Sequence, residues 1–338
     1  MAYQNVATPR FYVDLGQYLL AVKDTRYANL QTYSEHYFTF STQKIIHLMS
    51  LNPTKIVSRP NGHIGAQSSP DDEFVKVKRA APIRYVAYLG HNGGWLIPGW
   101  TDEYWNAGTS YEAGPFDGVN IHSGLAYPYP QYSGFSIFTF EDNANMAYLY
   151  ASAGDRVDGT KGKLGAISVG DYYDMPNSPD LDIKLSYEYD GVNTLQSKTG
   201  ATTSNAMYVR PANWSSPAWT LGAAGRDWNM DDRTGRRTWD LSFSYLSDSD
   251  ISPLNAQHSY FTGSEEDNFE TNIMDGTDFF STVWNKTLGN VLPFIFQPDN
   301  TNNEPDQFAI CKFINDTLEY EQVAPNVYDI KLKIKEVW

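Results

Sequence analysis

Apolar and polar residues alternate strictly near the end of the chain, between Tyr328 and Ile334. Apolar residues take every second position there, and charged residues fill the positions between them. Because successive side chains of a β-strand point to opposite faces, this pattern predicts a strand with one buried face. Its apolar members are Tyr328, Ile330, Leu332 and Ile334, and its charged members are Asp329, Lys331 and Lys333.

Similar alternation recurs along the chain. It is clear in residues 84–89, 135–140, 181–189 and 239–245. The chain also contains 25 glycines and 18 prolines, which punctuate these runs as turn residues do. We therefore predict a mainly β protein built from antiparallel β-sandwich material, with few helices.

A helix is predicted near the C-terminus. Apolar side chains and one threonine fall at helical spacing on a single face: Phe280, Val283, Trp284, Thr287 and Leu288. Asp278 is placed to begin this helix as its N-cap, and Gly289 to end it. A second, weaker helical pattern covers residues 11–23 or part of them, where Leu15, Leu19 and Val22 keep helical spacing.

The composition changes along the chain and suggests domain boundaries. Residues 52–72 are rich in Pro, Gly, Ser and Asn, as linkers and long loops are. We predict a central β-domain at residues 80–225, flanked by a second β-domain built from residues 1–75 and 226–338. The polar stretch 190–228 is predicted to form long loops.

Charge excludes one class of partner. The chain carries 25 basic against 40 acidic residues, a formal net charge of −15. Nucleic acid and anionic membrane surfaces need clustered basic side chains, so we expect neither specific nucleic-acid binding nor membrane binding. There is no signal peptide pattern and no apolar run of about 18 residues, so a soluble, cytoplasmically made product is expected.

No motif for catalysis or metal binding emerges. No two of the six histidines lie at the spacing that places two metal ligands on one face of a helix. Asp248 begins a run that resembles a calcium-binding loop, but Pro253 and Ser259 stand where such a loop needs glycine and glutamate. Cys311 is the one cysteine and lies in an apolar strand pattern, which indicates a buried structural residue. We expect no catalytic residues, no cofactor and no bound metal, and hence no enzymatic activity.

Aromatic residues gather in two segments that are the best candidates for a contact surface. They are Trp95, Trp100, Tyr104 and Trp105 in the first segment, and Tyr127 and Tyr129 in the second. Such rings can stack on sugars or pack between subunits, and packing is the favoured interpretation. Glycoside hydrolysis needs only two carboxylates beside such rings, so a glycosidase or depolymerase stays an alternative.

Basic residues are concentrated at one place, at Arg226, Arg233, Arg236 and Arg237. Aspartates are interleaved with them. The mixture indicates a salt-bridged hairpin or an intersubunit contact rather than a nucleic-acid patch.

Several segments resemble the tail-tip proteins of tailed, in particular marine, bacteriophages, of the distal tail or minor tail type. One of them is the strand and turn Tyr-Val-Ala-Tyr-Leu-Gly-His-Asn at 85–92. The segments are 4–14, 85–92, 164–170, 173–181, 236–245, 293–296 and 307–338. None of them is a catalytic fingerprint.

The resemblance implies a structural virion protein of the tail or its distal tip, made in the bacterial cytoplasm. It implies a β-sandwich assembly domain that forms a homo-oligomeric ring, a hexamer or a trimer, with an inserted jelly roll similar to carbohydrate-binding modules. Other tail proteins would be its partners. A host-glycan adhesin and a capsid decoration or head–tail joining protein remain alternatives.

Overall fold

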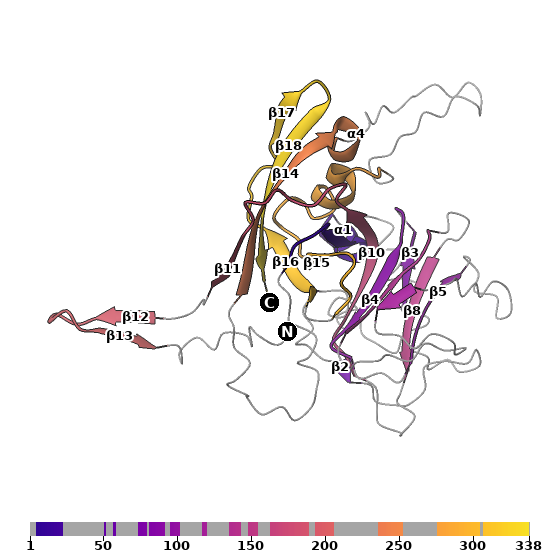
Figure 1. Cartoon of the computed structure of the whole chain (residues 1–338). Helices are drawn as coiled ribbons and strands as arrows, with labels where there is room; N and C mark the ends of the chain where they lie inside the picture. The colour runs from indigo at the N-terminus through magenta and orange to yellow at the C-terminus, as the bar shows by residue number, and fades with distance from the viewer. Residues whose placement is uncertain are drawn as a thin grey trace.

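The computed structural model describes fourteen stretches of the chain. They are residues 5–22, 51, 57–58, 74–79, 81–91, 95–101, 117–119, 135–142, 148–154, 163–188, 193–205, 236–252, 276–304 and 307–337. In these residues the protein is mainly β, as predicted, with few helices (Figure 1). The sandwich detail of the prediction stays a prediction.

Eleven strands form one large antiparallel sheet. Ten of them lie in the order β11 (Lys184–Glu188), β14 (Arg236–Ser247), β18 (Val327–Glu336), β16 (Ala309–Phe313), β15 (Phe294–Gln297), β1 (Arg10–Asp14), β10 (Ala166–Asp174), β4 (Tyr85–Leu89), β7 (Phe135–Thr139) and β6 (Asp117–Val119). The other strand, β17 (Tyr320–Ala324), pairs with the first half of β18.

Three smaller sheets complete the described strands. β3 (Phe74–Lys78), β8 (Tyr148–Gly154) and β5 (Trp95–Thr101) form a three-stranded sheet in that order. β2 (Val57–Ser58) pairs with β9 (Lys163–Leu164). β12 (Asn193–Gln196) and β13 (Thr202–Asn205) form a hairpin that projects away from the other strands in Figure 1.

The strand predictions are confirmed where the chain is described. The alternating run near the C-terminus lies in β18, where Ile330, Leu332 and Ile334 are buried and Lys331 and Lys333 are exposed. The runs at 84–89, 135–140 and 239–245 became β4, β7 and β14. The run at 181–189 became β11, which starts three residues later than its pattern.

The middle of the large sheet is buried on both faces. Phe11 and Val13 of β1 pack into a cluster that includes Trp239 and Phe294. Tyr12, between them, points to the opposite face and joins a second cluster with other side chains of β4 and β16. A strand covered on both faces is apolar throughout and loses the alternation that identifies it in a sequence.

That double burial explains why the helical pattern predicted for residues 11–23 or part of them holds for only part of that stretch. Residues up to Asp14 belong to β1, and the helix α1 occupies Leu15–Ala21 alone. Leu15 and Leu19 are buried as the helical spacing predicted, whereas Val22 is 41 % exposed beyond the end of α1. The apolar pattern therefore covers both a buried strand and the short helix that follows it.

The C-terminal helix is present but is a single π-helical turn, η4 (Phe280–Trp284). Asp278 accepts a hydrogen bond from the backbone N–H of Ser281 just before its beginning, which confirms the predicted start. η4 itself ends at Trp284, and Gly289, with a φ of 65°, lies in the turns that follow it. The wider turn changes the buried face. Phe279 and Val283 are fully buried, while Phe280 and Trp284 are only partly buried.

One further prediction needs correction. The stretch 190–228 was predicted to form long loops, but it contains the β12–β13 hairpin. The run at Asp248 forms a one-turn helix, α4 (Asp248–Ile251), capped by Ser247 and Asp250. The predicted domain boundaries stay a prediction, although β10 of the predicted module pairs directly with β1 of the predicted assembly domain.

Candidate functional site

The predicted aromatic contact residues fall in two groups. Trp95 and Trp100 lie in β5, opposite Gly154 and Leu149 of β8. The other four, Tyr104, Trp105, Tyr127 and Tyr129, lie outside the described residues. A glycan or subunit contact at these six positions therefore stays a prediction.

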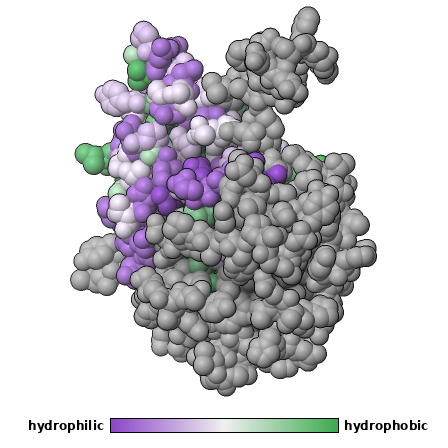
Figure 2. Space-filling model, turned by 90° about the vertical axis from the view of Figure 1, so that its right-hand side faces the viewer, coloured by the Kyte–Doolittle hydropathy of each residue, from purple (hydrophilic) through white to green (hydrophobic). Residues whose placement is uncertain are grey.

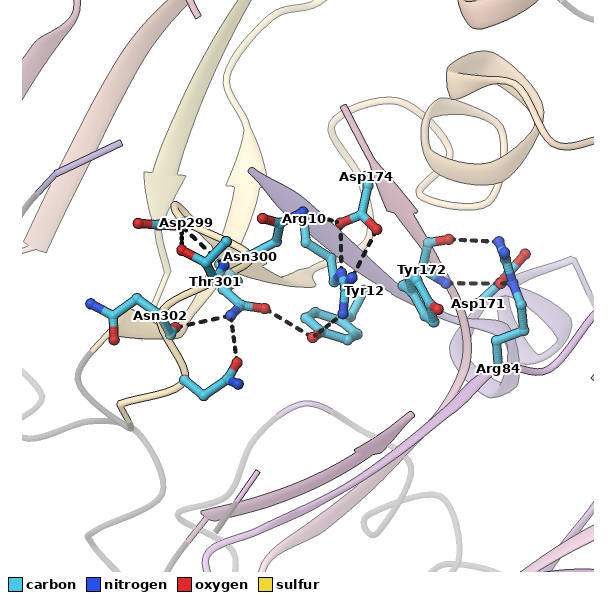
Figure 3. Close-up of polar contacts among 12 residues, drawn as sticks. Arg10, Tyr12, Arg84, Asp171, Tyr172, Asp174, Asp299, Asn300, Thr301 and Asn302 are labelled. Atoms are coloured by element: carbon cyan, nitrogen blue, oxygen red, sulfur yellow. Dashed lines mark hydrogen bonds and ion pairs between the residues drawn. The ribbon is translucent and has the colours of Figure 1, made fainter. Parts of the chain in front are cut away.

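The most extensive polar cluster among the described residues lies across β1, β10 and β4 (Figure 3). Arg10 of β1 donates two hydrogen bonds to the carboxylate of Asp174 in β10, from Nε at 2.6 Å and from Nη2 at 2.8 Å. Burial by itself would lower the pKa of the Arg10 guanidinium, but the hydrogen bonds to Asp174 and Tyr12 raise it above its ordinary value. The result is a firmly charged, bidentate ion pair.

A second arginine repeats this arrangement from the other side of β10. Arg84, next to the start of β4, pairs with Asp171 and donates a hydrogen bond from Nη2 to the carbonyl of Tyr172 at 2.8 Å. The ring of Tyr172 lies between the two cations. The guanidinium carbon of Arg10 is 4.3 Å from the ring centroid, and that of Arg84 is 4.7 Å from it. Cation–π attraction thus joins two ion pairs through one tyrosine.

The cluster extends toward the loop after β15. Tyr12 donates a hydrogen bond from its hydroxyl to Oε1 of Gln297 at 2.9 Å, and burial raises the pKa of Tyr12 to about 12. Gln297 in turn donates to the carbonyl of Asn302 at 3.0 Å. Asn300 donates from Nδ2 to Oδ1 of Asp174 at 3.1 Å, which closes the network. Residues from four segments distant in sequence are therefore tied together.

The chemistry of this cluster is that of a structural joint. Each arginine faces a carboxylate at hydrogen-bond distance, and Asp171 has only 3 % of its side chain exposed. Loss of either partner would leave the charge of the other uncompensated in a partly buried setting, which is unfavourable.

One buried carboxyl group does have a pKa near neutrality. Asp14 lies at the junction of β1 and α1, and its Oδ1 accepts a hydrogen bond from the backbone N–H of Gln17 at 3.0 Å. Burial raises the pKa of Asp14 to about 7, against hydrogen bonds from Gln17 and Ser168 that lower it. Among the described residues, its Oδ2 and the Nε2 of Gln17 have no hydrogen-bond partner. Ser168 also bonds the hydroxyl of Tyr85 at 2.7 Å.

Two other titratable groups are buried in unreactive settings. Burial lowers the pKa of His91 to about 4, so this histidine is neutral near pH 7, and its Nε2 lies 3.0 Å from the hydroxyl of Ser136. Burial raises the pKa of the Cys311 thiol well above its ordinary value. The prediction that Cys311 is a buried strand residue is confirmed, because it lies in β16 with none of its surface exposed.

The arginine cluster predicted to be salt-bridged includes an ion pair at Arg237. Arg237 donates from Nε to Oε2 of Glu336 at 3.2 Å, joining β14 to β18. This partner lies 99 residues away in the sequence. Arg226 and Arg233 lie outside the described residues, and Arg236 begins β14.

The described residues contain no group of three or more His, Cys, Asp or Glu side chains that could hold a metal ion. None of their helices is long and apolar enough to cross a membrane.

The ion pairs of Arg10 and Arg84 were not predicted because no local sequence pattern indicates them. Arg10 is 164 residues from Asp174, and Arg84 is 87 residues from Asp171, so only strand pairing brings each couple together. Asp14 did carry a signal. An aspartate directly before an apolar helical run is a common N-cap, and it was overlooked because the helix was started at residue 11.

Comparison with known proteins identifies no relative. No family model matches the chain, and neither a curated protein nor a solved structure is significantly similar to it.

Proposed function

We propose that this protein is a structural virion component of a tailed bacteriophage, a ring-forming protein of the tail or its distal tip. In this role the chain has no enzymatic activity, and its partners are further copies of itself and other tail proteins. The resemblance of its sequence segments to tail-tip proteins motivates this proposal.

The observation that supports the proposal most directly is that ion pairs connect neighbouring strands of the described sheet. Arg10, Arg84 and Arg237 each pair with a carboxylate on a neighbouring strand, across β1, β10, β4, β14 and β18. An enzyme of this size brings titratable groups together around a reacting centre. Here the buried ion pairs fasten strand to strand instead, as suits a protein that transmits load within an assembly.

Imaging of the purified chain tests the proposal. We expect negative-stain images of the concentrated protein to show rings with a central hole and three-fold or six-fold symmetry. Light scattering should give a mass that is the matching multiple of 38.1 kDa.

Two outcomes would count against it. A monomer at every concentration would remove the ring-forming role. Turnover of a bacterial capsule or lipopolysaccharide preparation by the same sample would replace the structural role with an enzymatic one.

A further inference from the structure

The β12–β13 hairpin stands apart from the rest of the described fold. We call residues 193–205 the hairpin arm. Figure 1 shows it projecting away from the large sheet. Every residue from Thr194 to Ser204 is exposed, and Leu195 has 74 % of its surface exposed although it is a large apolar residue. A two-stranded hairpin without a packed face is only marginally stable in water, so the arm gains stability by docking.

The arm presents backbone groups along its outer edges. Ser197 donates its backbone N–H to the carbonyl of Ala201 at 2.8 Å, so this pair is hydrogen-bonded across the hairpin. Hydrogen-bonded and non-bonded pairs alternate in an antiparallel ladder. Thr194 and Ser204, which face each other three positions further on, are therefore a non-bonded pair whose N–H and C=O groups point outward.

The composition of the arm favours strand addition. It contains no proline, and its one charged residue is Lys198, near the turn. The chain as a whole, by contrast, carries a net charge of −15. Natural proteins protect exposed strand edges with charges, prolines or bulges. An uncharged edge rich in Thr and Ser, without such protection, is typical of an edge that a partner covers.

The described fold offers a complementary edge in β17. Within the described residues, β17 pairs with β18 alone, with a bulge between Gln322 and Ala324, and its residues from Glu321 to Ala324 are exposed. Val323 has 50 % of its surface exposed there. Residues 314–324 contain Asp316, Glu319 and Glu321 and no basic residue, so this edge is acidic. The visible coloured surface in Figure 2 is mainly hydrophilic, with single apolar side chains among polar ones.

We infer that the hairpin arm of one copy adds to the β17 edge of a second copy. The outward backbone groups of the arm extend the sheet, Leu195 covers Val323, and Lys198 lies near the acidic residues around Glu321. The donor and the acceptor are different surfaces of one chain. Such a head-to-tail contact closes into a ring when the rotation between copies allows it. The inference rests on the proposed function, since it names the contact by which copies would assemble.

Two full-length double variants test the backbone part of this contact. Thr194→Pro/Ser204→Pro removes an outward N–H from each edge of the arm and leaves its internal ladder. Thr194→Ala/Ser204→Ala is the matched control, since it removes the 2.9 Å hydroxyl contact but keeps both N–H groups. In sedimentation velocity we expect the proline variant to associate about tenfold more weakly or worse, and the alanine variant to associate like the wild type. Circular dichroism should show the same fold in all three.

A charge exchange tests the receiving strand. Lys198→Glu and Glu321→Lys should each weaken association at low ionic strength, and the double variant should recover most of it. If the proline variant forms the same rings as the wild type, the arm contact is overturned and the proposed function stands. If the proline substitutions weaken association but neither charge change does, β17 is overturned as the receiving strand. A wild-type monomer would overturn both the inference and the proposed function.

Discussion

Asp14 shows how a single residue can link the stability of this fold to pH. Its carboxyl group caps the beginning of α1 through the backbone of Gln17, yet only 2 % of its surface is exposed. A helix N-terminus favours the charged form of a carboxylate, whereas burial disfavours it. Burial dominates here, and the pKa of Asp14 rises from 3.8 to about 7.

The free energy of unfolding should therefore fall as the pH rises through this range. Between pH 3.8 and about 7 the native carboxyl keeps its proton while the unfolded one has lost it, so the native state binds more protons. We expect this group alone to lower stability by on the order of 4 kcal/mol from about pH 4 to about pH 8. Asp14→Asn should flatten that slope in urea unfolding curves.

Thr287→Ala is the control for this experiment. It removes a buried hydroxyl that bonds the carbonyl of Val283 at 2.9 Å but carries no titratable group. It should lower stability by a similar amount at each pH. A wild-type slope that persists in Asp14→Asn would show that another group carries the pH dependence.

Gly170 is required by the close approach of two backbones. A Cβ at this position would lie 2.0 Å from the carbonyl oxygen of Val13 and 2.7 Å from the backbone nitrogen of Leu15. These are main-chain atoms at the turn from β1 into α1, so they cannot rotate away. We expect Gly170→Ala to cost about 3 kcal/mol or more in urea unfolding.

Gly200→Ala provides the comparison for Gly170. Gly200 has a φ of 87° with nothing within 4 Å of its added Cβ. Only backbone strain should act there, costing about 1–2 kcal/mol within the hairpin arm. Equal effects of the two substitutions on global unfolding would refute the steric argument at Gly170.

At the scale of the element, η4 differs from an α-helix in its backbone hydrogen bonds. The backbone N–H of Asn285 donates to the carbonyl of Phe280 five residues back, at 2.8 Å, and that of Gly289 donates to Trp284 in the same way at 2.9 Å. A wider turn rotates the following side chains relative to an α-helix. Phe279, just before η4, is fully buried against Phe11, whose ring centroid is 5.6 Å away, whereas Phe280 is only partly buried.

The neighbouring phenylalanines give a matched test of that difference in burial. Phe279→Ala should cost about 3–5 kcal/mol, because Phe279 is fully buried and also contacts Tyr173 and Phe313. Phe280→Ala, the same chemical change one residue on, should cost about 1 kcal/mol because its side chain is only partly buried. Chemical unfolding measures both, and the reverse order would contradict the burial of Phe279 in the core.

At the scale of the whole molecule, the large sheet joins parts of the chain that the sequence separates. β10 lies between β1 and β4, and β15 continues the sheet on the other side of β1. The Arg10–Asp174 pair and the stacked Tyr172 reinforce the β1–β10 junction. Both faces of this region are covered, so the junction is part of the core.

We expect a fragment of residues 80–225 to be much less stable than the full chain. Removing β1 would leave one edge of β10 without its partner and would expose the buried clusters around Tyr12 and Phe11. The fragment should show no cooperative thermal transition, and a peptide of residues 5–22 added in excess should restore one. A fragment that unfolds cooperatively without the peptide would show that the predicted module is independent of β1.

Sequence reasoning predicted most where the pattern is local. The strand β18, which has one solvated face, was identified from its alternation, and the start of the C-terminal helix from Asp278. It failed at β1, whose two faces are both buried, and at the β12–β13 hairpin, whose polar residues do not alternate. The candidate site was out of reach because its ion pairs join strands far apart in the sequence.

The sequence by itself determined the mainly β class, the burial of Cys311 and the acidic character of the chain, because each depends on composition or on a period of two residues. Only the tertiary structure decided which strands pair. That pairing set Arg10 opposite Asp174 and raised the pKa of Asp14, and the path of the chain left the hairpin arm exposed. The physical reason is range. Periodicity acts between neighbouring residues, whereas hydrogen bonds between strands, burial and charge pairing depend on residues that folding brings together.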